Sequence, residues 1–91
     1  MYKIKVLKIA INSITSITKY ITEDNIFYAN KVQEYIYKSI NLLKDFPFIG
    51  KEIDENHRII IESHYKFKIV YKITGKTIFI VGVYREQNDW K

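Results

Sequence analysis

Cysteine is absent from this sequence of 91 residues, proline occurs once and glycine three times. Without cysteine the chain has no disulfide, no thiolate nucleophile and no thiolate ligand for zinc, and a reducing compartment is compatible with this composition. Only His57 and His64 remain as imidazole ligands, and the carboxylates lack ligand spacing, so we predict no metal site. A chain this short also has too small a core to enclose a large cofactor, and we predict none.

Long apolar runs are also missing. No stretch approaches the roughly 18 apolar residues of a membrane span, and residues 1–8 alternate charged with apolar residues instead of forming a signal-peptide core. We therefore expect a cytoplasmic protein without a membrane segment. A composition of 47% apolar and 27% charged residues is typical of one globular domain, which we expect to span residues 1–91.

Positive charge is unevenly distributed within a formal net charge of +5. Residues 1–57 hold eight basic and seven acidic groups, or +1, whereas residues 58–91 hold seven basic and three acidic groups, or +4. An acidic partner should therefore meet the last third of the chain, unless the charge serves only solubility. Arg58 and Arg85 are the two arginines of this third, and guanidinium groups bind carboxylates or phosphates in a bidentate manner that lysine cannot reproduce.

Two helices are predicted after a first strand. Residues 2–7 alternate apolar residues with lysine, the pattern of a half-buried strand. Two later stripes have helical spacing: Ala10, Ile14, Ile17 and Ile21, then Ile26, Ala29, Val32, Ile36, Ile40 and Leu43. Asp24 or Asn25 should cap the second helix, and Phe46–Pro47 should end it. The connector is short, so the helices should form an antiparallel hairpin.

Three further strands are expected at residues 58–63, 65–73 and 77–84, with a turn at 74–76. In the loop before them, Gly50 should supply a turn. The middle strand should place Tyr65, Phe67, Ile69, Tyr71 and Ile73 on a core face, and Lys66, Lys68, Val70 and Lys72 on a wet, positive face. The last strand is apolar on both faces, so it should lie inside the sheet with cover on each side.

The predicted fold class is α+β. It comprises an N-terminal strand and an antiparallel helical hairpin packed on a mainly antiparallel sheet with three C-terminal strands.

The order and spacing of several short motifs resemble the RelE/ParE superfamily of toxins from bacterial type II toxin–antitoxin modules. The motifs are Ala10, Tyr20-Ile21, Ala29, Leu43-x-x-Phe46-Pro47-x-x-Gly50, Arg58, Ile69-Val70-Tyr71 and Ile78-x-Ile80-x-x-Val83-Tyr84-Arg85. The proline–glycine loop, the arginine after it and the strand that ends in Val-Tyr are more similar to the ParE branch. This resemblance implies a RelE/ParE-like fold and a toxin that a cognate antitoxin neutralises in a hetero-oligomer. ParE-like members poison DNA gyrase, and RelE-like members cut messenger RNA on the ribosome.

The first functional hypothesis is a gyrase-inhibiting toxin that acts by binding and not by catalysis. Its predicted target-binding residues are Lys66, Lys68, Lys72, Tyr84, Arg85 and Trp90, with the tail 86–91. The lysine row could attract an acidic antitoxin, an acidic gyrase surface or a nucleic-acid backbone, and the alternative is an ordinary solvated sheet face.

The predicted antitoxin-binding residues are Arg58, Tyr35 and Phe48. Exposed aromatic residues near the second helix and the loop after it would form an apolar groove for an antitoxin helix, and the alternative is that they only pack in the core. Arg58 could equally form an internal salt bridge with Glu62 or Asp54.

The second hypothesis is a metal-independent endoribonuclease of the RelE type. By resemblance, Lys68 and Arg85 would hold the phosphate, but the C-terminal tyrosine of that branch is absent, and the indole of Trp90 cannot exchange a proton. His57 and His64 at opposite ends of one strand would be about 20 Å apart, too far to serve one phosphate. A third possibility is a degenerate module that binds antitoxin and is no longer toxic.

Overall fold

The computed structural model describes residues 2–22 and 25–85. Within them, two helices and five strands follow one another along the chain. They are β1 Lys3–Val6, α1 Lys8–Thr22, α2 Ile26–Leu42, β2 Lys51–Glu52, β3 Arg58–Ile61, β4 Lys68–Thr74 and β5 Thr77–Tyr84. No helix in the described ranges is long and apolar enough to cross a membrane.

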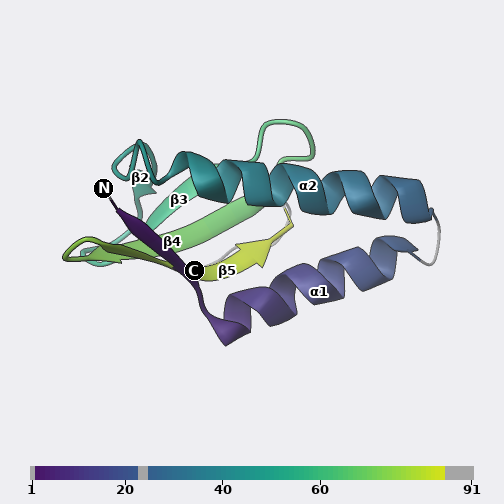
Figure 1. Ribbon diagram of the computed structural model, residues 1–91, viewed down its shortest axis with the longest axis horizontal. Helices are drawn as coiled ribbons and strands as arrows, with labels where there is room; N and C mark the ends of the chain where they lie inside the picture. The colour runs from purple at the N-terminus through teal and green to yellow at the C-terminus, as the bar shows by residue number, and fades with distance from the viewer. Residues whose placement is uncertain (1, 23–24, 86–91) are drawn as a thin grey trace.

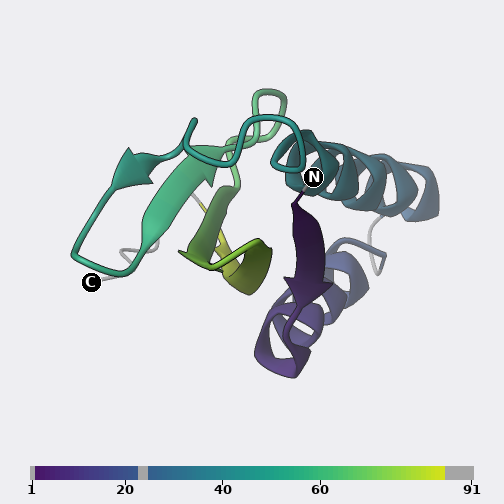
Figure 2. The ribbon, with the colours of Figure 1, turned by 60° about the vertical axis from the view of Figure 1, so that its left-hand side comes forward.

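The strands form one sheet in the order β1-β5-β4-β3-β2. The first strand runs parallel to β5, and the other neighbours are antiparallel. The two helices lie side by side and form a second layer (Figures 1 and 2). A core of buried apolar side chains joins this helical layer to one face of the sheet. The predicted α+β class with a helical hairpin on a mainly antiparallel sheet is therefore confirmed.

Both predicted helical stripes reach the core with one exception. Ala10, Ile14 and Ile17 of α1 are buried, and so is the α2 stripe from Ala29 to Leu43. Ile26 is 57% exposed, because the first turn of α2 extends beyond the sheet (Figure 1). Asn25 is the N-cap, as one of the two alternatives predicted, and its side chain accepts a hydrogen bond from the Tyr28 amide. The alternative cap, Asp24, and the side chain of Ile21 lie outside the described part.

The second helix ends earlier than the proline predicts. Its last residue is Leu42, and the chain then tightens through hydrogen bonds from the amides of Leu43, Lys44 and Asp45 to carbonyls three residues before. Such bonds satisfy the last carbonyls of a helix in a narrower turn. The proline therefore follows a turn that has already left the α-helical path.

The strand predicted at residues 65–73 begins only at Lys68. The buried carboxylate of Glu62 accepts hydrogen bonds from the amides of His64 and Tyr65, at 2.6 and 2.7 Å, and so holds a turn there. Lys66 has a left-handed backbone with φ of 64°. The prediction that Lys66 belongs to the lysine row of the strand is therefore wrong, because local hydrogen bonding to Glu62 replaces the ladder.

The outer face of the sheet, predicted to be wet and positive, is only partly exposed to solvent. Lys68 and Lys72 point to this face, as predicted, but Val70 between them is fully buried. The last strand lies inside the sheet as predicted. Its cover on the outer side is incomplete, because Phe79 and Val81 remain half-buried there.

Candidate functional site: two interaction surfaces

The segment between α2 and β2 is held by a buried tyrosine. The Tyr71 hydroxyl donates a hydrogen bond to the Pro47 carbonyl and accepts one from the Gly50 amide, both at 2.9 Å. Burial raises the pKa of this hydroxyl, which keeps it a neutral donor. Gly50 is required here for a reason other than the predicted turn, since a Cβ atom would come within 2.5 Å of the Tyr71 oxygen.

Arg58 holds the same segment from the sheet side. Its guanidinium donates to the carbonyls of Phe48 and Gly50, at 3.2 and 2.7 Å. It also pairs with the Glu52 carboxylate at 2.9 Å. The internal salt bridge considered for Arg58 therefore exists, but its partner is Glu52 and neither Glu62 nor Asp54, because β2 pairs with β3 and places Glu52 opposite Arg58.

This anchored segment displays apolar side chains to solvent. Phe46, Phe48 and Ile49 are each between 55% and 59% exposed, and Leu42 at the end of α2 adds to them. The Phe48 ring packs at right angles to the ring of Tyr2, and the guanidinium of Arg58 lies over it. We call Leu42, Phe46, Phe48 and Ile49 the aromatic platform. Exposed apolar patches on a rigid support are typical of protein-binding surfaces.

Tyr35 lies away from this platform, in a cluster beside the turn after β3. Its ring stacks on that of His64 at 3.9 Å and contacts Tyr65, which in turn meets Tyr28 edge to face. Burial raises the pKa of the Tyr65 hydroxyl, and neighbouring phenols and a carboxylate raise it further. The structure thus brings Arg58 and Phe48 together and leaves the third predicted antitoxin-binding residue, Tyr35, apart from them.

The outer face of the sheet collects lysines from three strands, β1, β2 and β4. Strand register places Lys3 and Lys5 beside Thr77 and Phe79, and Lys72 beside the same Phe79. Lys51 pairs with Ile59, which pairs with Val70 of the outer face, and Lys68 pairs with Tyr84. Both lysines therefore face the same side of the sheet. We call Lys3, Lys5, Lys51, Lys68 and Lys72 the lysine face. No aspartate or glutamate of the described strands points to this side, since Glu52 shares the inner side with Arg58.

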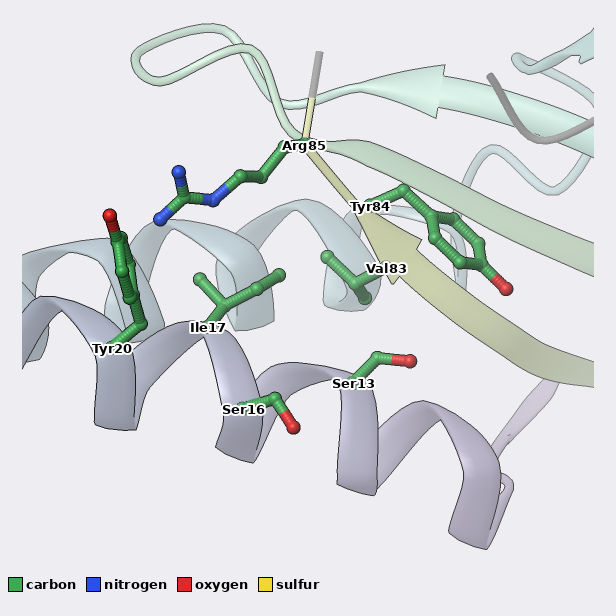
Figure 3. A pocket seen from close by; sticks show the side chains of 7 residues that line it. All are labelled: Ser13, Ser16, Ile17, Tyr20, Val83, Tyr84 and Arg85. Carbon is green, nitrogen blue, oxygen red and sulfur yellow. The ribbon is translucent and has the colours of Figure 1, made fainter. Parts of the chain in front are cut away.

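Arg85 lies on the other side of the sheet from the lysine face. Its guanidinium carbon is 4.4 Å from the centre of the Tyr20 ring of α1 (Figure 3). Tyr84 points outward, and its ring lies over Gly82, where a Cβ atom would collide with it. Lys68 and Arg85 are therefore separated by the sheet, although both were predicted to meet one phosphate or target. Trp90 and the tail 86–91 lie outside the described residues.

The histidines do not form a catalytic pair in this structure. The His57 imidazole contacts the Asp54 carboxylate at 3.1 Å, and His64 stacks on the aromatic cluster near Glu62. The Asn56 amide and then the His57 ring lower the pKa of Asp54. In the ranges 2–22 and 25–85, no group of three or more histidine or acidic side chains could hold a metal ion.

Sequence reasoning placed Gly50 in a turn and Tyr71 on the core face, but it missed the contact between them and the turn that Glu62 holds. The one visible signal was Gly50 itself, which follows Phe48-Ile49. Its contact partner, Tyr71, lies 21 residues further along the chain.

The fold and its surfaces define a small α+β protein with a helical hairpin, a basic sheet face and an exposed apolar platform. The chain belongs to the family described as ParE toxin of type II toxin-antitoxin system, parDE, whose model matches residues 4–90. Its structure is similar to one titled "Chromosomal ParDE TA system from P. aeruginosa", with a TM-score of 0.82 and 19% identity. The match covers 93% of this chain and 96% of that chain. No curated protein matches the sequence significantly.

Proposed function

We propose that this member of the ParE family is a toxin that inhibits DNA gyrase by binding and that a cognate antitoxin neutralises it. The observation that carries the proposal is the lysine face, which gathers five ammonium groups and no carboxylate from the described strands. Such a face attracts an acidic protein surface and accelerates association with it. The half-buried Phe79, Val81 and Tyr84 add apolar contact area between the lysines.

The aromatic platform is the proposed antitoxin-binding surface, with Arg58 as its support. It offers exposed rings that an amphipathic helix of the antitoxin can cover. The platform and the lysine face share no residue, so the two partners have different contact residues, although Lys51 lies only two positions after Ile49. We propose that the cytoplasmic complex is a hetero-oligomer of toxin and antitoxin.

Induced expression without antitoxin tests this function. We expect growth to stop with DNA-damage signalling, and purified protein to impair supercoiling by gyrase. Co-expression of the protein encoded beside this chain should restore growth. Cut messages beside unaltered supercoiling would reject the gyrase target in favour of the RelE-type activity, and normal growth would indicate a degenerate module.

The ribonuclease alternative has less support from the geometry. Its two phosphate-holding residues, Lys68 and Arg85, lie on opposite sides of the sheet. Metal-independent cleavage requires cations and acid–base groups around one phosphate.

Phe48→Ala is expected to weaken antitoxin binding about tenfold to a hundredfold, because an exposed ring on a rigid support is a typical interface hot spot. Phe27→Ala is the matched control, since Phe27 is 79% exposed in the first turn of α2 and does not belong to the platform. Titration of the purified antitoxin by calorimetry measures both affinities. Equal losses in the two variants would contradict the assignment of the platform.

A further inference from the structure

A cavity of about 470 Å³ opens between α1 and the end of β5 (Figure 3). It is lined by Ser13, Ser16, Ile17, Tyr20, Val83, Tyr84 and Arg85. Along α1 the lining extends from Ser13 to Tyr20, seven residue steps or about 10 Å of helix. The volume is larger than one side chain needs and suits a short peptide segment or a small molecule.

Arg85 places a guanidinium group, and so a positive charge, at one end of the cavity. The Tyr20 ring supports the flat face of its guanidinium. No acidic side chain of the described residues lies within ion-pair distance of it. Arg58, by contrast, already donates to two carbonyls and a carboxylate. The N–H groups of Arg85 therefore make no ion pair with the described part of the chain and are able to bind a carboxylate from a partner.

The rest of the lining is mixed, with two serines, two tyrosines and two aliphatic side chains. The side chains of Ile17 and Val83 form its floor and are nearly buried, at 8% and 2% exposure. The Ser13 hydroxyl donates to the Ile9 carbonyl and keeps its lone pairs for a donor from outside. The site thus combines one cationic end with an apolar floor, which matches an acidic residue followed by an apolar one.

We propose that this cavity binds an acidic, amphipathic segment of the toxin's protein target, with an Asp or Glu carboxylate on Arg85 and an apolar side chain on Ile17 and Val83. The inference rests on the proposed function, and it names a contact with the target beyond the lysine face. A net charge of +5 disfavours a second copy of this chain as the occupant.

The position of the cavity favours the target over the antitoxin. The aromatic platform contacts Tyr2, next to Lys3, which pairs with the first residue of β5. The cavity lies at the last residues of the same strand. Eight residues of strand separate the two sites by about 25 Å. A partner on the platform therefore leaves the cavity open.

Arg85→Gln tests the proposal with the full-length protein. Hydrogen bonds to a charged group account for about tenfold to a hundredfold in affinity, so we expect at least a tenfold loss both of growth inhibition per molecule expressed and of gyrase inhibition. Arg85→Lys should lose nearly as much, because an ammonium cannot form the bidentate contact. Lys76→Gln is the matched control, since Lys76 lies over the Tyr2 ring at the opposite end of β5, and it should stay within twofold of the wild type.

Tyr20→Leu provides a second variant, because Tyr20 is 58% exposed on a helix and its removal leaves the core intact. Its growth inhibition and gyrase inhibition should fall about threefold, since Arg85 keeps its charge but loses the supporting ring. Thermal unfolding of each purified variant verifies folding. If Arg85→Gln retained wild-type toxicity, or lost only antitoxin affinity, the cavity proposal would be overturned.

The growth readout separates this proposal from the gyrase target. If the wild type stops growth and leaves supercoiling unaltered, the gyrase proposal fails, and a tenfold loss of growth inhibition in Arg85→Gln still supports the cavity. If the wild type inhibits gyrase and Arg85→Gln inhibits it equally, the cavity proposal fails and the gyrase proposal stands.

Discussion

Gly50→Ala is expected to lower the free energy of unfolding by about 3 kcal/mol, a large part of the stability of a domain of this size. The new Cβ would lie 2.5 Å from the Tyr71 oxygen and 2.7 Å from a ring carbon. Tyr71 is fully buried and tied to the Pro47 carbonyl, so its ring cannot move aside without breaking its hydrogen bonds. Chemical denaturation of the purified protein measures the loss.

Three variants distinguish this collision from other effects of replacing a glycine. Gly75→Ala should cost about 1 kcal/mol, because Gly75 has a φ of 60° but open space around it. Tyr71→Phe should cost about 2 kcal/mol through the lost hydrogen bonds. The double variant Gly50→Ala with Tyr71→Phe should be less destabilised than the two single losses predict, since the closest clash is gone. Strict additivity would contradict the proposed contact.

Reversing two charges on the lysine face, Lys5→Glu with Lys72→Glu, is expected to raise the concentration for half-inhibition of the target at least tenfold. Lys5 is exposed on the edge strand β1 and Lys72 lies over the Phe79 ring, so the two lysines flank Phe79 from the two strands that pair with β5. Like charges placed against an acidic surface repel it and slow association. Supercoiling assays and association rates at low and high salt measure the effect, which should shrink as salt screens it.

The matched control is Lys19→Glu with Lys31→Glu, two exposed lysines of the helices. Both pairs lower the net charge by four, from +5 to +1. We expect the helical pair to change inhibition by less than threefold. An equal loss in both pairs would show that overall charge, and not this face, governs binding.

Much of the architecture could be predicted because it depends on patterns local in the chain. Helical spacing identified the buried stripes of α1 and α2, and the side chain of Asn25 marked the start of α2. The prediction was wrong for Lys66, because alternation of apolar and charged residues continued through a turn. The buried carboxylate that holds this turn, Glu62, has no distinguishing sequence signal.

The surfaces were less predictable than the fold. Arg58 and Phe48, both predicted to bind the antitoxin, lie against each other, and the salt-bridge partner of the arginine, Glu52, was not predicted. Arg85 was grouped with the lysine row, but its side chain points to the opposite side of the sheet. Lys3, Lys5 and Lys51 were not selected, since they lie far from the row along the chain.

The amino-acid sequence by itself determined the class of fold, the order of its elements, the excess of positive charge and the family, because periodicity, composition and motif spacing are properties of neighbouring residues. Tertiary structure alone decided which charges share a face, why Gly50 must lack a side chain and where Arg85 meets Tyr20. These features depend on strand register and on contacts between residues tens of positions apart, which local patterns do not encode.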